Sequence, residues 1–270
     1  MKELKWRRLS EDVSCATENL QNSHFLPAGG YKAIQKSMDR APVVVNPDIT
    51  IKKNEQTKDY LLCADCEQRF SRNGEAWILA HCNQPERGFR LKEIIDGVAP
   101  IGRTDSMSFY SAANTQIDIE EMTYFVSSIM WRGSAHQWHS GNHRVQSPNL
   151  GPYEDDLRRY LLGETGFPEN MALWISVITD PKLWVTMIVP YGEKLAGQAY
   201  WRYKFVFHGL TFMFFVGRTI DPLIRRSCSY RSPEQFIFMG DNLNDMIISD
   251  FGKVILKSRP VGSLKPSVVA

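Results

Sequence analysis

Two cysteines at C-x-x-C spacing constrain this chain more than any other feature. Cys63 and Cys66 lie in the stretch 60–77, after two leucines typical of a short strand and before a polar segment typical of a helix. This spacing lets a tight turn present two thiolates to one tetrahedral metal ion. The pattern therefore predicts a zinc knuckle that leads into a helix. A redox-active dithiol and two cysteines that fill apolar space are the alternatives at this point.

The composition indicates a folded protein of a reducing compartment. Of the 270 residues, 43% are hydrophobic, which is enough for a sizeable core, and three of the five cysteines fall between positions 63 and 82. The N-terminal stretch has basic residues without an apolar run after them, and no segment has the length of a membrane span. We therefore expect a cytoplasmic protein without membrane contact. The net charge of +2 by itself indicates no particular partner.

Other residues of metal-ligand type precede the C-x-x-C pair. Asp12 and Cys15 lie upstream, and His24 stands in the sequence Ser-His-Phe-Leu-Pro over positions 23–27. The order along the chain is therefore a carboxylate and a cysteine, a histidine, a spacer, the C-x-x-C pair and a helix. Cysteine, histidine and carboxylate are the side chains that bind zinc in proteins.

The two motifs S-H-x-x-P and L-L-C-x-x-C-E resemble those of zinc-containing members of the HNH endonuclease superfamily and their bacterial relatives. The resemblance covers about the first third of the chain. It implies a ββα-metal or treble-clef core, in which zinc joins two knuckles and the histidine lies on a hairpin that faces the helix. In active HNH nucleases this histidine activates a water for attack on a phosphodiester, and a second, divalent metal stabilises the developing charge.

The first knuckle departs from the family pattern, because it is reduced to Asp12 and Cys15. A four-ligand zinc site then consists of one carboxylate and three thiolates, from Asp12, Cys15, Cys63 and Cys66. His81 and Cys82 are the other nearby sources of a fourth ligand.

The positions expected to carry catalysis also depart from the pattern. Ser23 stands where active nucleases often have an acidic metal ligand, and Glu67 stands where they often have Asn or His. The resemblance implies His24 as general base, with Glu67 or Asp65 near Mg²⁺ or Mn²⁺. From the residues alone, His24 could instead hold the turn before Pro27 by a hydrogen bond. Glu67 could instead be an acidic residue in the first turn of the helix, where the positive end of the helix dipole stabilises its charge.

A buried helix is predicted from Asp118 onward. Asp118 and Glu121 have the spacing of a capping box, and apolar residues recur at helical spacing up to position 130. Arg132, in the same apolar helix, requires a carboxylate or a phosphate partner, and a structural ion pair is the expected answer.

Three histidines follow this helix, at positions 136, 139 and 143. A continuous helix would place them near one face, but Ser-Gly-Asn interrupts the pattern before the third. We therefore expect a role at a helix end or an interface in preference to a metal site.

The second half of the chain predicts a sheet. Four segments are rich in β-branched and aromatic residues, at 173–179, 183–189, 200–208 and 210–216. They predict an antiparallel meander with a tight connection at Gly209, to which 236–239 could add a strand. The fold class expected is α+β, with an HNH-like zinc module at 1–85 and an α+β domain at 86–270. That domain has helices within 118–162, strands within 172–217 and an irregular C-terminal part.

The resemblance implies a metal-dependent HNH-like endonuclease or a degenerate relative, a hydrolase that acts on phosphodiester bonds of nucleic acid. The alternative is a non-catalytic zinc-stapled module that binds nucleic acid or protein. The expected cofactors are structural Zn²⁺ and catalytic Mg²⁺ or Mn²⁺. The expected partners are nucleic acid and a second protein or a second copy of the chain.

Overall fold

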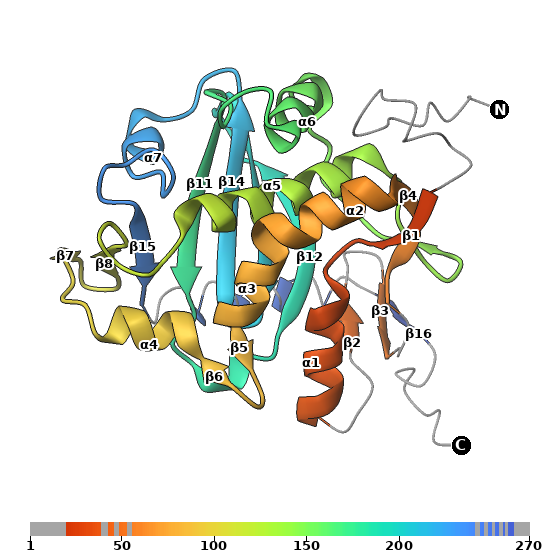
Figure 1. The fold of residues 1–270 in the computed structure, drawn as a ribbon, viewed down its shortest axis with the longest axis horizontal. Coiled ribbons are helices and arrows are strands. Elements are labelled where there is room, and N and C mark those ends of the chain that lie inside the picture. Colours follow the sequence, from red (N-terminus) through yellow and green to blue (C-terminus); the bar gives the residue numbers. More distant parts are fainter. Residues whose placement is uncertain are drawn as a thin grey trace.

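A seven-stranded sheet is the largest element of this protein (Figure 1). The computed structural model describes residues 20–38, 43–45, 49–52, 56–240, 244–245, 248–249, 252–253, 256 and 259–261. The strands lie in the order β12 (Met187–Lys194), β13 (Tyr200–Phe207), β14 (Leu210–Gly217), β11 (Met171–Val177), β15 (Phe236–Met239), β8 (Ser108–Ser111) and β7 (Gly102–Arg103).

The sheet confirms the α+β class, but the simple meander is wrong. β12, β13 and β14 are antiparallel neighbours, whereas β11 pairs with β14 on one side and runs parallel to β15 on the other. β11 is almost wholly buried, so its backbone groups need a strand on each side. The strand expected at 183–189 starts later, at Met187. Before it, Asp180 caps a short 3₁₀ turn, Pro181–Leu183, by accepting a hydrogen bond from the Lys182 amide.

The expected tight connection between β13 and β14 is confirmed. His208 and Gly209 are its two residues, and both have positive φ, at 44° and 86°. Such angles at both central positions characterise the two-residue turn that matches the twist of antiparallel strands. Most aromatic residues of β13 and β14 lie in the core on one face of the sheet, while Tyr200 and Phe215 lie in the cluster on the other face, and every residue of β14 is buried. Both faces of the sheet are therefore covered.

The helix α5 (Ile119–Ala135) lies across one face of the sheet. The ring of Phe125 lies 5.3 Å from that of Phe207 and 5.9 Å from that of Phe212, measured between centroids. The opposite side of α5 contacts α2 (Ala64–Phe70), the π-helical segment η3 (Ser71–Glu75) and α3 (Ala76–His81). The other helices are α1 (Ala28–Met38), α4 (Arg90–Asp96), the 3₁₀ turn Gly151–Tyr153, α6 (Glu154–Leu162) and α7 (Pro222–Arg226).

A kink at Gly74 separates α2 from α3 in the helical segment that follows the C-x-x-C pair. Gly74 has φ +90°, and a Cβ there would lie 2.6 Å from the backbone nitrogen of Phe125. The glycine therefore lets η3 lie directly against the backbone of α5. Asp118 caps α5 as predicted, accepting from the Glu121 amide at 3.0 Å. The Glu121 carboxylate, however, accepts a hydrogen bond from the amide of Gly74.

The remaining strands form small separate sheets. They are β1 (Leu20–His24) with β4 (Lys58–Cys63), β16 (Arg259–Val261) with β3 (Ile49–Lys52) and β2 (Val43–Val45), β5 (Asn83–Gln84) with β6 (Gly88–Phe89), and β9 (His139–Ser140) with β10 (His143–Arg144). One core cluster contains Phe70 and Ile78 together with Phe125 and Phe205. Residues from both sides of the expected domain boundary at 85 thus share a core, and the boundary stays a prediction.

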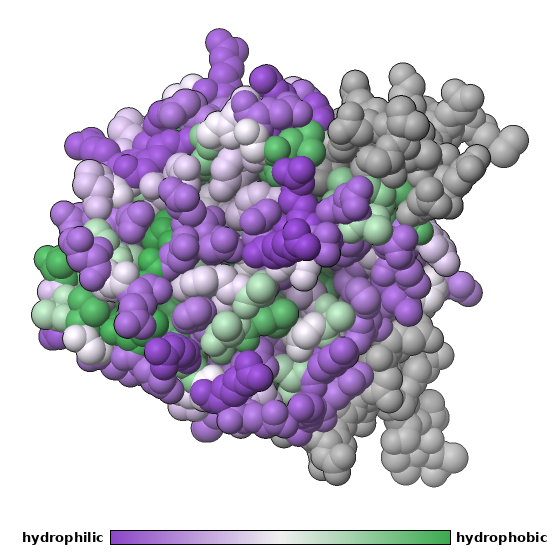
Figure 2. All heavy atoms as spheres, in the orientation of Figure 1, coloured by the Kyte–Doolittle hydropathy of each residue, from purple (hydrophilic) through white to green (hydrophobic). Residues whose placement is uncertain are grey.

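The face of the molecule seen in Figure 2 is mostly hydrophilic, because the helices of this side turn their apolar residues toward the sheet. Apolar groups gather near α4 and β7, where Ile101 is 51% exposed. Within the ranges given above, no helix is both long and apolar enough to cross a bilayer.

Candidate functional site

The antiparallel pair β1–β4 followed by α2 is the local unit that carries the sequence motifs (Figure 1). His24, at the end of β1, is opposite Lys58, and Leu20, at its start, is opposite Cys63. α2 begins directly after β4, with Cys63 as its N-cap in extended conformation. The order strand, strand, helix is the one that the resemblance implies, and the two expected sites lie at different places along the unit.

The thiol end of this unit contains Cys63 and Cys66. Both thiols are buried, and they lie one turn apart at the start of α2. Leu20, the first described residue, pairs with Cys63. Asp12 and Cys15 lie outside the described residues, so their part in a zinc site stays a prediction.

His81 and Cys82 are not brought to the thiol end. Among the described residues no three His, Cys, Asp or Glu side chains gather as a metal site would require, so neither residue joins both Cys63 and Cys66. Cys82 follows α3, and its Sγ accepts a hydrogen bond from Gln84 at 3.4 Å. Burial raises the pKa of the Cys82 thiol to about 12, so this side chain stays protonated and is a poor ligand on its own.

The histidine end of the unit contains His24 and the carboxylate of Glu67. Burial lowers the pKa of His24, while the nearby charge of Glu67 and a hydrogen bond with the side chain of Gln56 oppose this effect. The positive charges of Lys58 and Arg132 lower the pKa further. His24 is therefore mainly neutral at pH 7 and has a ring nitrogen able to accept a proton.

Glu67 has an unusual environment for a residue in the first turn of a helix. Its Oε1 is buried, and no described group donates a hydrogen bond to it. A buried carboxylate oxygen without a donor is costly unless a cation or a water satisfies it. The helix dipole alone therefore does not account for this side chain. Asp65, in the same turn, is exposed.

Ser23 has a structural role in the hairpin. It is 1% exposed, and its hydroxyl accepts a hydrogen bond from the amide of Leu62 at 3.1 Å and donates to the carbonyl of Gln21 at 3.3 Å. These bonds lie beside the irregular register between Gln21 and Asn22. Ser23 thus holds the two strands together, at the position where the resemblance leads one to expect an acidic metal ligand.

Arg132 confirms the expected structural ion pair. Its Nη2 lies 2.6 Å from Oε1 of Glu75, and both side chains are largely buried. Its Nη1 donates to the carbonyl of His24 at 3.3 Å, and its guanidinium lies 4.8 Å from the ring centroid of Phe70. The pair ties α5 to the backbone of His24, and the Glu75 side chain is largely buried.

Among the described residues, His136 and His139 belong to no group that could hold a metal, and the side chain of His143 lies outside those residues. α5 ends at Ala135, and Nε2 of His136 lies 2.9 Å from Oδ2 of Asp59 on β4. Partial burial raises the pKa of Asp59, but the hydrogen bonds from His136 and from the Tyr60 amide outweigh it, so the net shift is downward. Local spacing could not reveal this pair, because 77 residues separate its members.

No family model matches the chain, and a search of curated proteins and one of solved structures each found no significant match.

Proposed function

We propose that the protein is an HNH-like, metal-dependent endonuclease that acts on phosphodiester bonds of nucleic acid. The observation that carries the proposal is that a neutral His24 lies within electrostatic range of Glu67, whose buried carboxylate oxygen has no described hydrogen-bond donor. A proton acceptor beside a hard oxygen ligand is what metal-assisted hydrolysis of a phosphodiester requires.

Each side chain has a distinct role in this proposal. His24 accepts the proton of the attacking water, and the Arg132–Glu75 pair fixes the backbone that carries it. Glu67 would hold Mg²⁺ or Mn²⁺ through an oxygen that has no other described partner. Such an ion, when bound, stabilises the charge on the phosphate and the leaving oxygen.

The zinc is proposed as a structural ion at the other end of the unit. The buried thiols of Cys63 and Cys66 suit zinc, since thiolate sulfur is its preferred ligand in structural sites. Asp12 and Cys15 would complete the four ligands.

One observation favours the alternative, a zinc-stapled module that binds nucleic acid or protein without cutting. The Ser23 hydroxyl is used within the hairpin and replaces the carboxylate that active relatives often have at this position. A module of this kind would keep the fold and the binding surface while lacking one metal ligand.

A nicking assay separates the two functions. Purified protein is incubated with supercoiled plasmid, single-stranded DNA and RNA, each with Mg²⁺ or Mn²⁺, alongside His24→Ala and Glu67→Gln. Loss of a general base lowers hydrolysis by about 100-fold or more, so His24→Ala should abolish visible cleavage. His81→Ala is the matched control, because this histidine lies on α3 with its Nδ1 bound to the Trp77 carbonyl. Wild-type protein that binds these substrates but cuts none of them would establish the alternative.

A further inference from the structure

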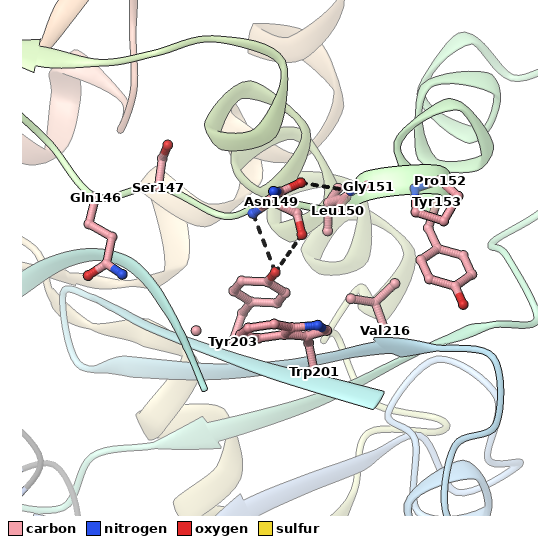
Figure 3. A pocket seen from close by; sticks show the side chains of 11 residues that line it. Gln146, Ser147, Asn149, Leu150, Gly151, Pro152, Tyr153, Trp201, Tyr203 and Val216 are labelled. Atoms are coloured by element: carbon pink, nitrogen blue, oxygen red, sulfur yellow. Dashed lines mark hydrogen bonds between the residues drawn. The ribbon is translucent and has the colours of Figure 1, made fainter. Parts of the chain in front are cut away.

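A pocket of about 340 Å³ lies between β13 and the segment 146–153 (Figure 3). This volume is at the lower end of the range of about 300–1,000 Å³ typical of small-ligand sites. The segment follows the β9–β10 hairpin and leads into α6. The pocket is separate from the thiol and histidine ends of the β1–β4–α2 unit, and its lining residues come from other elements.

The floor of the pocket is an exposed aromatic ring. Trp201 is 43% exposed, and Figure 3 shows its ring lying beneath the segment that carries Asn149 and Gly151. The ring of Tyr203 lies 6.1 Å away, centroid to centroid, at an interplanar angle of 18°. Tyr203 is buried and lies against Gly192 of β12, which has no Cβ to displace the ring. The tryptophan therefore has a fixed neighbour on one side and an open area for stacking.

Hydrogen bonds hold the segment 146–153 in place over the pocket. The hydroxyl of Tyr203 donates to the Asn149 carbonyl at 2.7 Å and accepts from the Asn149 amide at 3.3 Å. Oδ1 of Asn149 accepts from the amide of Gly151 at 3.0 Å. These bonds fix the segment over the aromatic surface of Trp201.

A cation lies next to this aromatic surface. Lys194 is the direct cross-strand partner of Trp201, so the two side chains project from the same face of the sheet. Lys194 is exposed and has no ion pair with any described residue. Its neighbours Arg202 and Lys204, by contrast, are both paired with Glu193. A flat aromatic ring and an uncommitted ammonium group on the same face of the sheet match a base and a phosphate.

We propose that this pocket binds one nucleotide of a single-stranded nucleic acid, with the base stacked on Trp201 and a phosphate at Lys194. The inference rests on the proposed function for the identity of the ligand. It extends the nucleic-acid surface beyond His24, the candidate general base. A Cβ on Gly133 of α5 would lie 3.0 Å from the ring of Phe25 and against Pro148 as well. The residue after His24 and the segment that roofs the pocket therefore contact the same position of α5.

The test measures binding without cleavage. A fluorescein-labelled oligodeoxythymidylate of about twelve nucleotides, within the range of about 4–16 for single-strand sites, is titrated with protein in EDTA and followed by anisotropy. Trp201→Ala should weaken binding by about 5-fold or more, and Trp201→Phe should weaken it less, because stacking on an aromatic ring is partly kept. Leu223→Ala on α7 is the control, since Leu223 is 68% exposed and lies outside the pocket.

A second arm tests the phosphate contact. Lys194→Ala should weaken binding and reduce the slope of log affinity against log salt by about 0.7, the value for one phosphate of a single strand. Lys182→Ala, an exposed lysine before the opposite end of β12, should leave the slope unchanged. An affinity that is the same in wild type, Trp201→Ala and Lys194→Ala would overturn the inference.

The result separates this inference from the proposed function. Trp201-dependent binding by a protein that cuts no substrate would support the pocket and contradict the nuclease. His24-dependent cleavage with unchanged binding in Trp201→Ala would support the nuclease and contradict the pocket. Tryptophan fluorescence that is quenched by a neutral oligosaccharide such as maltotriose in the wild type but not in Trp201→Phe, without any response to the oligonucleotide, would also contradict the inference.

Discussion

Nη2 of Arg132 lies 2.6 Å from Oε1 of Glu75, in a position where water has almost no access to the guanidinium. The pair joins the end of η3 to α5, and Nη1 of the same arginine donates to the carbonyl of His24. The backbone of His24, the candidate general base, is thus held by Arg132 of α5, the helix that packs on the central sheet. A change at this ion pair should affect both the stability of the fold and the geometry of the site.

Replacing Arg132 by Met should lower the free energy of unfolding by about 3–5 kcal/mol, because the Glu75 carboxylate would remain buried without its cation. Urea denaturation followed by circular dichroism measures this change. The double variant Arg132→Met, Glu75→Met should lose less than the sum of the two single variants. Lys92→Met, which breaks the more exposed pair with Asp96, should cost less than about 1 kcal/mol. Equal losses in the Lys92 and Arg132 variants would contradict the structural role of the buried pair.

His208 should make the protein sensitive to mild acid. Burial lowers its pKa from 6.5 to about 4, although the hydrogen bond of Nε2 with the Gly30 carbonyl opposes the shift. Between these pH values the unfolded chain binds the extra proton, so stability is highest above pH 6.5 and falls toward pH 4. Below pH 4, the loss in the free energy of unfolding that His208 causes is about 3 kcal/mol.

Unfolding of His208→Asn, measured from pH 7 to pH 4, tests this effect. Asn tolerates the positive φ of position 208 and does not titrate, so the variant should lose less stability with falling pH than the wild type does. His139→Asn, at an exposed position, is the control. Identical pH profiles for wild type and His208→Asn would contradict the assignment.

Gly74→Ala should destabilise the protein by about 2–5 kcal/mol. The positive φ costs about 1–2 kcal/mol for an L-residue, and the added Cβ would crowd the backbone of Phe125 by a further 1–3 kcal/mol or so. Gly163→Ala at the end of α6 is a matched control, because Gly163 has φ +78° with nothing within 4 Å of an added Cβ. Thermal unfolding should show a clearly smaller loss for Gly163→Ala, and similar losses would indicate that η3 does not lie against α5.

Cys63→Ser and Cys66→Ser should each remove bound zinc and lower the melting temperature, since a structural zinc site contributes directly to folding. Elemental analysis of protein purified without added metal measures the zinc content. Cys228→Ser is the control, because this buried cysteine lies in the core on the far side of the sheet, where its Sγ accepts from the Leu173 amide. Wild-type protein without stoichiometric zinc would contradict the structural zinc site and would favour Cys63 and Cys66 as buried free thiols.

Local patterns in the sequence were sufficient for many of the elements. Cys63 was expected between a strand and a helix, and it is the last residue of β4 and the N-cap of α2. Asp118 caps α5. Gly209 completes the two-residue turn of the β13–β14 hairpin. Each of these features depends on residues close together in the chain, where hydrophobic period, capping and backbone freedom act directly.

The sequence by itself also determined that Arg132 needs a partner, because a guanidinium cannot be buried alone. Only the tertiary structure decided that Glu75 is this partner, that Asp59 takes His136, and that β11 pairs with β14 and β15. It likewise brought Trp201 beneath the segment that carries Asn149 and left an oxygen of Glu67 without a described donor near His24. These pairings join residues far apart in the chain. They follow from how the helices and the sheet pack, and no local period encodes them.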